Sequence, residues 1–395
     1  MIYNFDEKID RLNSDSIKWM AYGEDVLPLW VADMDFISPR PVIDALIKRA
    51  EHGIFGYGLP QKQLTETICE RLQTLYEWKV VPNEIVYLPG VVVGFNNVTH
   101  ALAQPGRAVL MMTPVYGPFL TAPDYATAIR QDVVLEKDET GHYYIDFEKF
   151  ENTIDENTRL FLLCNPHNPL GRVFTKQELS RLAEICLKHH IPICSDEIHC
   201  DLIFKGHHHI PIASLNPEIA YQTITLMAPS KTFNIAGLGC SFAIVQNPEF
   251  RELLEKAQSG LVSHVNILGT QAALAAYQNG GDWLNQLLDY LTINRDYLLN
   301  YVKENFLGAQ ISPIEGTYLA WIDFRNTPIA ENPFLFFLKN ARVALNDGCT
   351  FGSGGDGFVR LNFGCTKSTL MTALDRMKAA FNNINGLNQE KSFDL

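Results

Sequence analysis

The feature that most constrains the fold is a series of short, continuous apolar strings between about residues 84 and 250. The strings are EIVYL (84–88), AVLMM (108–112), RLFLLC (159–164), IPICS (191–195), TITLMA (223–228) and SFAIVQ (241–246). Strings without polar alternation, separated by stretches long enough for helices, are typical of parallel strands that are buried on both faces. We therefore predict an α/β fold with a mostly parallel central sheet covered by helices. The last string, SFAIVQ, fits one more strand of this sheet, which could be antiparallel to the others.

The helical pattern and the chain length indicate how this sheet is accompanied. Thr175 and Glu178 have the spacing of a capping box, which predicts a helix over about 176–189. A chain of 395 residues is too long for one simple core. The stretch after about residue 285 starts with a long helical pattern and continues with strand-like TYLAWIDF and VRLNFG. The predicted division is a large domain over 49–285 and a smaller α+β domain formed by 286–395 with the N-terminal segment 1–48.

Composition argues against several classes of protein. The formal net charge of −13 disfavours nucleic acid and anionic membrane as the main partner, because both need a basic face. No apolar run approaches the roughly 18–20 residues of a membrane span, and the polar N-terminus lacks a secretory signal pattern. Eight scattered cysteines are interpreted as reduced thiols of a cytoplasmic protein. The HHH at 207–209 is expected in an exposed loop, not at a metal.

Five residues of chemical interest follow the ends of different apolar strings: Gly90, Tyr116, Asn168, Asp196 and Lys231. The carboxyl ends of parallel strands lie at one edge of a sheet, and ligands of open α/β sheets bind at that edge. We therefore expect these five residues to lie close together around a ligand.

Each of these residues also has a purely structural interpretation. The PGVVVGF segment fits an ordinary glycine turn or a phosphate site, in which the N–H groups of Val91 and Val92 and the helix dipole meet an anion. Tyr116 fits a turn aromatic or a ring that lies on a planar cofactor. Because Asp196 directly follows a buried strand, its carboxylate needs a partner, which is either a structural arginine or a cationic ring nitrogen of a ligand. Lys231 fits a snorkelling lysine or a desolvated amine with a lowered pKa that condenses with aldehydes.

The functional interpretations together describe one ligand. A flat ring, a phosphate, an acidic partner for a ring nitrogen and an amine for a carbonyl group match pyridoxal 5′-phosphate (PLP). The order of glycine loop, aromatic residue, NPxG, Asp, Lys and late Arg resembles the fold-type I, PLP-dependent class I/II aminotransferase superfamily over nearly the whole chain. Five longer motifs resemble the MalY/PatB-type cystathionine β-lyases: WVADMDF (30–36), NPHNPLGRVF (165–174), SDEIHCDLIF (195–204), SKTFNIAGL (230–238) and EGTYLAWIDF (315–324).

This resemblance implies a role for each residue at the cofactor. Lys231 would form the Schiff base with PLP and act in catalysis, and Asp196 would pair with the pyridine nitrogen. Asn168 would bond the 3′-oxygen of the ring, on which Tyr116 would stack. The remaining implied cofactor residues are Val91, Val92 and Ser230 at the phosphate and His199 near the ring oxygen.

The resemblance also implies how substrate and subunits are arranged. Arg360 would hold the substrate α-carboxylate as a bidentate fork. Tyr57 in GYGLP would reach the phosphate and substrate of the neighbouring subunit, which implies a homodimer with shared active sites. The plausible wall positions for the distal part of the substrate are Asp33, Tyr318 and Asn346.

Two departures from the superfamily pattern favour the lyase branch. Aminotransferases generally carry an arginine eight residues after the lysine, where this chain has Gly239. The tyrosine usually found three residues after the aspartate is His199. The implied activity is α,β-elimination from L-cystathionine or other S-substituted cysteines to thiol (homocysteine), pyruvate and ammonia. The alternative is a class I/II aminotransferase acting on an aromatic, histidinol-phosphate-like or acidic amino acid.

Overall fold

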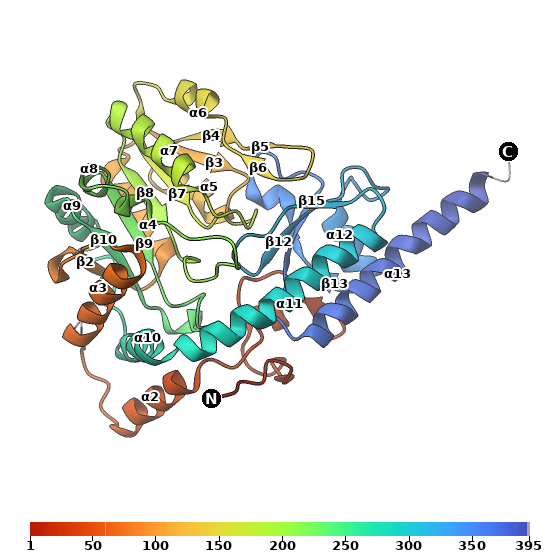
Figure 1. Cartoon of the computed structure of the whole chain (residues 1–395), viewed down its shortest axis with the longest axis horizontal. Helices are drawn as coiled ribbons and strands as arrows, with labels where there is room; N and C mark the ends of the chain where they lie inside the picture. The colour runs from red at the N-terminus through yellow and green to blue at the C-terminus, as the bar shows by residue number, and fades with distance from the viewer. Residues whose placement is uncertain (60, 393–395) are drawn as a thin grey trace.

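The computed structural model describes residues 1–59 and 61–392, which form two larger sheets, two short two-stranded sheets and the helices around them (Figure 1). The central sheet has the spatial order β2 (Ile85–Leu88), β10 (Ser241–Val245), β9 (Thr223–Met227), β8 (Ile193–Asp196), β7 (Thr158–Cys164), β3 (Ala108–Thr113) and β4 (Ile129–Val134). The strands from β9 to β4 are parallel, and β10 is antiparallel to both of its neighbours. The predicted fold class is confirmed, as is the antiparallel strand.

Both faces of the central sheet are buried, which explains its continuous apolar strings. In β3, Leu110 and Met112 pack on one face, whereas Val109 and Met111 pack on the other. The helices of the large sheet are α3 (Lys62–Tyr76), α4 (Val91–Leu102), α5 (Gly117–Tyr125), α6 (Phe147–Thr153), α7 (Lys176–Lys188), α8 (Pro217–Tyr221), α9 (Pro248–Gln258) and α10 (Ile267–Asn279). The helix predicted at 176–189 is α7, and Thr175 and Glu178 form its capping box.

The second sheet belongs to the C-terminal part of the chain. Its antiparallel strands have the order β11 (Gln310–Ile311), β12 (Leu319–Asp323), β15 (Phe358–Asn362) and β14 (Asn346–Asp347). The long helices α11 (Gly281–Asn305) and α13 (Lys367–Ser392) run beside each other, with α12 (Pro333–Asn340) next to them (Figure 1). A short hairpin, β5 (Glu136–Lys137) with β6 (Tyr143–Tyr144), extends from the large sheet.

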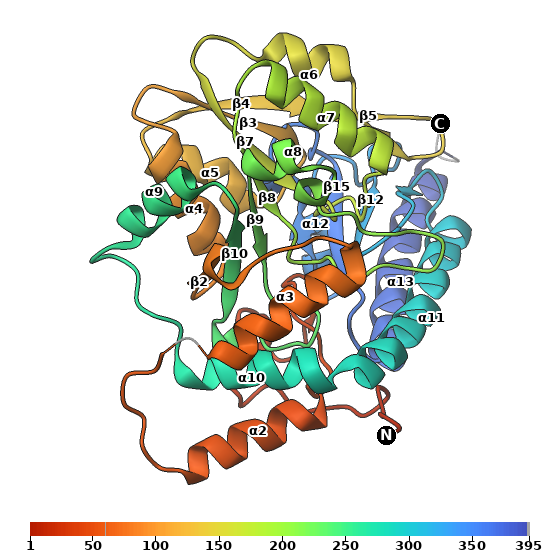
Figure 2. The same cartoon turned by 60° about the vertical axis from the view of Figure 1, so that its left-hand side comes forward.

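The N-terminal segment contacts both parts of the molecule. After α1 (Ile17–Met20), β1 (Leu27–Pro28) pairs in parallel with β13 (Val343–Ala344) of the C-terminal part. Farther on, α2 (Arg40–Glu51) packs along α10, as Figure 2 shows. The domain boundaries given above stay predictions, and residues 393–395 of the predicted small domain lie outside the described residues. No helix in the described ranges is long and apolar enough to cross a membrane.

Candidate active site

A cavity of about 190 Å³ lies at the carboxyl edge of the central sheet. The residues that the sequence predicts around one cofactor within a single subunit all line it: Val91, Val92, Tyr116, Asn168, Asp196, His199, Ser230 and Lys231. They lie at or just after the carboxyl ends of β2, β3, β7, β8 and β9, so the sheet brings distant parts of the chain to one place. The expectation that these side chains lie close together is confirmed.

One end of the cavity is the N-terminus of α4. Gly90 is the N-cap, and a side chain at that position would meet nothing within 4 Å, so the backbone is open to a ligand. The first backbone bond of the helix runs from the N–H of Gly94 to the carbonyl of Gly90. The N–H groups of Val91 and Val92 precede this bond and therefore have no partner within the helix. These groups and the dipole of α4 suit an anion such as a phosphate.

The amine of Lys231 lies at the centre of the site. It follows β9, is half-buried, and donates a 2.7 Å hydrogen bond to the carbonyl oxygen of Ala32. Burial lowers the pKa of Lys231 to about 8, with smaller effects from nearby charges: the carboxylates of Asp33 and Asp196 raise it, and the guanidinium of Arg360 lowers it. A larger fraction of the amine is therefore neutral near pH 8 than for an ordinary lysine, and a neutral amine can condense with an aldehyde.

Asp196 is a buried carboxylate without a cationic side-chain partner in the described residues. It is 5% exposed, and its Oδ1 accepts a 3.0 Å hydrogen bond from the N–H of Ile198. Burial raises the pKa of Asp196 to about 7. No lysine, arginine or histidine of the described chain forms an ion pair with it, so the structural-arginine interpretation finds no support. A cationic ring nitrogen of a ligand would restore the charge balance.

His199 lines the same cavity and has a polar atom without a partner among the described residues. It is 2% exposed, and its Nδ1 is buried with no hydrogen-bond partner among the described residues. Burial lowers the pKa of His199 to about 3, so the imidazole is neutral. Burial likewise raises the pKa of Tyr116, which keeps its phenol protonated. A neutral imidazole nitrogen without a partner fits a polar ring substituent such as the 3′-oxygen of PLP.

Arg360 adds a buried guanidinium next to Asn168, a residue of the cavity lining. It lies in β15, is 3% exposed, and donates to three neutral oxygens, on Asn168 (2.8 Å), Trp30 (2.8 Å, backbone) and Asn346. Its Nε has no partner among the described residues, and burial lowers the pKa of Arg360 to about 10. A buried cation that contacts only neutral acceptors is suited to bind the carboxylate of a ligand.

Arg172 shows the contrast within the same molecule. It is also 3% exposed, but its guanidinium pairs with the carboxylates of Glu178 at 2.9 Å and Glu315 at 3.1 Å. The two buried arginines therefore differ in whether the protein itself supplies the negative charge. This difference separates a structural arginine from a candidate binding group.

Sequence reasoning missed the part played by the backbone of residues 30–36. The carbonyl oxygen of Ala32 accepts from Lys231 and also from the hydroxyl of Tyr318, at 2.9 Å. Asn234 fixes the segment, because its side-chain amide bonds the backbone of Met34 on both sides. The motif WVADMDF was visible in the sequence, but nothing in it shows which carbonyl groups point into a site.

Several other predicted positions lie outside the cavity lining. The carboxylate of Asp33 is held by Arg11 at 3.0 Å and Lys18 at 3.6 Å, so its role with the substrate stays a prediction. Tyr57 is fully exposed, and Pro60 of its GYGLP motif lies outside the described residues. Tyr318 is buried and contacts the site through the carbonyl oxygen of Ala32, and Asn346 contacts it through Arg360.

The histidine run is only in part the exposed loop that was expected. His207 and His208 are exposed, but that prediction is wrong for His209. His209 is 8% exposed and its Nε2 lies 2.8 Å from a carboxylate oxygen of Glu197, because this buried carboxylate needs a partner. Within residues 1–59 and 61–392, no group of three or more potential metal ligands is found.

A lysine, a buried aspartate and a helix N-terminus around one cavity at the carboxyl edge of a mostly parallel sheet define a PLP-dependent enzyme of the aminotransferase fold. Residues 24–377 match the family described as aminotransferase class I and II, and the chain belongs to this family.

Individual relatives indicate which branch of this family the chain resembles. The chain is 39% identical to cystathionine β-lyase PatB of Bacillus subtilis (strain 168), over 95% of this chain and 99% of that protein. It is 31% identical to protein MalY of Escherichia coli (strain K12), over 93% and 96% of the two chains. The structure of cystalysin from Treponema denticola, which contains pyridoxal 5′-phosphate, matches with a TM-score of 0.93 and 34% identity, covering 97% of this chain and 100% of that one. The predicted similarity to the MalY/PatB type is confirmed.

Proposed function

We propose that the chain is a PLP-dependent C–S β-lyase that cleaves L-cystathionine or other S-substituted cysteines into a thiol, pyruvate and ammonia. The observation that carries this proposal is a pair of uncompensated charges at the cavity of Lys231. Asp196 lines this cavity and has no cationic side-chain partner in the described chain, whereas Arg360 has no carboxylate partner there and donates to Asn168 of the cavity lining. The relatives named cystathionine β-lyase support the reaction type.

The residues of the cavity fit PLP. Val91, Val92 and Ser230 would hold the phosphate, and Asp196 the pyridine nitrogen. Asn168 would bond the 3′-oxygen of the ring, with His199 near it and Tyr116 against the ring. When bound, PLP supplies an aldehyde for the amino groups of Lys231 and substrate and a ring that withdraws electrons from the substrate Cα.

The protein groups perform the remaining chemistry. Arg360 binds the α-carboxylate and thereby orients the Cα–H bond toward Lys231. The amine of Lys231 takes the Cα proton as a general base, which its lowered pKa favours. The electron pair left at Cα forms a Cα–Cβ double bond while the Cβ–S bond breaks and the sulfur leaves as a thiolate, which is then protonated. Addition of water to the remaining three-carbon unit gives pyruvate and ammonia.

Gly239 gives a structural reason for favouring the lyase over the aminotransferase. Its φ is +55°, and an added Cβ would lie 3.1 Å from the carbonyl oxygen of Pro89. Pro89 directly precedes Gly90, the N-cap of α4 at the proposed phosphate site. An arginine in this left-handed conformation would be strained by about 1 kcal/mol or more. The phosphate anchor that aminotransferases generally carry at this position is therefore disfavoured here.

The deciding experiment supplies L-cystathionine to the cofactor-loaded protein and measures pyruvate and free thiol. Equal amounts of both products are expected. Transfer of amino groups to an added 2-oxo acid, without pyruvate, would support the aminotransferase alternative instead. A matched measurement on Lys231→Ala controls for non-enzymatic cleavage.

The proposal includes a homodimer with shared active sites and a cytoplasmic location. Tyr57 lies with the exposed apolar side chains of Ile54, Phe55 and Leu59 in one segment, which suits burial against a second copy. The free thiols of all eight cysteines are consistent with a reducing compartment. If Tyr57 completes the partner's site, mixing Lys231→Ala and Tyr57→Ala chains regenerates one intact site per mixed dimer. About a quarter of wild-type activity is then expected at equal mixing; no gain on mixing would contradict the shared site.

A further inference from the structure

We propose that Asp201 is a positioning residue for Lys231, acting through Thr232 and held in place by Arg71. Thr232 directly follows Lys231 in the chain and is completely buried. Its hydroxyl donates a 2.9 Å hydrogen bond to Oδ2 of Asp201, while Oδ1 of Asp201 forms an ion pair with Arg71. This inference rests on the proposed function, in which Lys231 is the reactive amine.

The bond joins the two segments that carry the central residues of the site. Asp201 belongs to the segment after β8, which also holds His199 and directly follows Asp196, the last residue of β8. Thr232 belongs to the segment after the neighbouring strand β9. Within the segment after β8, a backbone hydrogen bond of 2.9 Å from the N–H of Leu202 to the carbonyl oxygen of His199 links Asp201 to His199. Asp201 therefore fixes the position of the lysine relative to the aspartate and the histidine.

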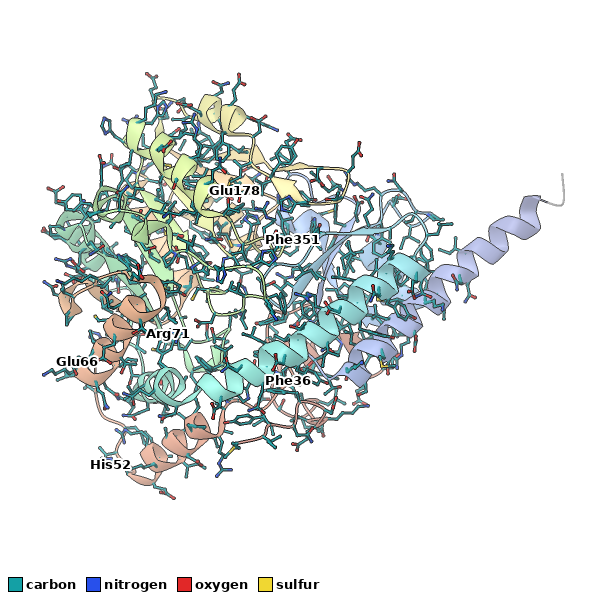
Figure 3. The ribbon with its side chains drawn as sticks, in the orientation of Figure 1. Phe36, His52, Glu66, Arg71, Glu178 and Phe351 are labelled. Atoms are coloured by element: carbon teal, nitrogen blue, oxygen red, sulfur yellow. The ribbon has the colours of Figure 1, made fainter. Side chains whose placement is uncertain are left out.

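The charge of Asp201 requires Arg71. The side chain of Asp201 is 5% exposed, and a buried carboxylate is stable only with a cation and hydrogen bonds. Arg71 supplies the cation from α3, and its guanidinium also lies over the ring of Tyr277, 5.0 Å from the centroid. Figure 3 shows Arg71 on the side of α3 toward the interior and Glu66 of the same helix at the outer edge of the molecule.

The geometry leaves Lys231 fixed at two points. Its amine is bonded to the carbonyl of Ala32 at one end, and its main chain is held through Thr232 at the other. α3 begins shortly after the exposed segment of Tyr57, so the same helix connects the candidate dimer contact with the lysine. Without the Thr232–Asp201 bond, the amine would reach water more easily and react less often in the productive position.

The test uses Thr232→Val, which removes the hydroxyl and keeps the shape. The first readout is the rate at which cofactor-free protein gains its visible absorbance when PLP is added, as a function of pH. The midpoint of this profile is expected to rise by about one pH unit, because a less buried amine has a pKa closer to its ordinary value. The second is steady-state turnover, where kcat should fall about tenfold while KM changes less than twofold.

Two matched variants separate positioning from general damage. Thr232→Ser restores the hydroxyl and should restore both readouts. Thr225→Val makes the same chemical change at a buried threonine of β9 whose hydroxyl has no partner among the described residues, and it should behave as wild type. If Thr232→Val does not fold, Asp201→Asn takes its place, since it retains the size and one acceptor oxygen but loses the ion pair with Arg71.

The outcomes distinguish this inference from the proposed function. A wild-type protein that never gains visible absorbance with PLP contradicts the proposed function. If the wild-type protein gains the absorbance, two results would overturn the role of Asp201. One is a Thr232→Val pH profile that coincides with the wild-type profile, and the other is a Thr225→Val profile that shifts as much as that of Thr232→Val.

Discussion

The guanidinium of Arg360 donates to the amide oxygen of Asn168 across 2.8 Å, between two buried side chains that lie 192 residues apart. Arg360 is the proposed substrate-binding residue, and Asn168 the proposed partner of the cofactor ring oxygen. The residue proposed to bind the substrate and a residue proposed to bind the cofactor are thus in direct contact. A carboxylate that recruits Arg360 also changes the surroundings of Asn168.

Replacing Arg360 by methionine is expected to impair substrate binding and leave cofactor loading intact. The loss of a charge-assisted bidentate contact corresponds to about 3 kcal/mol, or a roughly 100-fold lower kcat/KM. The cofactor-free protein should lose little stability, because a buried cation without a carboxylate partner is removed. The matched control is Arg172→Met, which strands Glu315 and should unfold at lower denaturant concentration. Equal destabilisation by both variants would contradict the distinction between the two arginines.

The rate of PLP loading should depend on the protonation of Lys231. The pKa of this amine is lowered from 10.5 to about 8 by burial, and only the neutral form condenses with an aldehyde. The loading rate is therefore expected to rise about tenfold per pH unit up to about pH 8 and then to level off. Stopped-flow absorbance between pH 6 and 10 measures this. Lys231→Ala should show no band at any pH while its circular dichroism stays native, and a flat wild-type profile would refute the assignment.

Asp196→Asn is expected to stabilise the cofactor-free protein in a pH-dependent way. Burial raises the pKa of Asp196 from 3.8 to about 7, so the folded state binds its proton more tightly than the unfolded state. The stability that this proton contributes is present below about pH 4 and is lost as the pH rises through 7. The advantage of the variant over wild type should therefore grow between pH 5 and pH 8, by about 2–3 kcal/mol, because about two of the pH units between the two pKa values lie in this range. Thermal unfolding at both pH values tests this, and a constant difference would count against the raised pKa.

The segment 30–36 should loosen when Asp35 is replaced by alanine. Its carboxylate bonds the completely buried Lys18 at 2.8 Å and Arg11 at 2.7 Å, and the loss of one partner of such a buried pair costs about 3–5 kcal/mol. Urea unfolding should show this loss, together with slower PLP loading, because the carbonyl of Ala32 is displaced from Lys231.

The exposed ion pair of Arg40 and Asp44 in α2 provides the control for this prediction. Asp44→Ala removes a carboxylate of similar geometry from the surface and should cost less than about 1 kcal/mol. Comparable losses from Asp35→Ala and Asp44→Ala would show that the buried network does not hold the segment.

The strands of the central sheet were predictable because burial on both faces leaves long apolar strings. The exception is β4 at the edge, IRQDVV, in which Ile129 and Arg130 are exposed and only Val133 is buried. An edge strand with one neighbour does not need a continuous apolar sequence, so this strand lacks the signal that revealed the others.

The site was predictable where side chains carry the chemistry and not where the backbone does. Lys231 and Asp196 stand out because polar groups after buried strands need a reason to be there. The carbonyl of Ala32 has no signature, since every residue has one and only the fold shows where it points. Asp201 lay within a quoted motif, but its partner Arg71 is 130 residues away. Sequence distance therefore hides the contacts that hold the reactive residues in place.

The hydrogen bond between Arg360 and the carbonyl oxygen of Trp30 spans 330 residues. One consequence concerns the order in which the site is made during synthesis. Every residue proposed to hold the cofactor within a subunit has been translated by Lys231, whereas the proposed substrate arginine comes near the end of the chain. A ribosome that stops before Arg360 would release a polypeptide with the amine proposed to bind the aldehyde and without the arginine proposed to select amino acids.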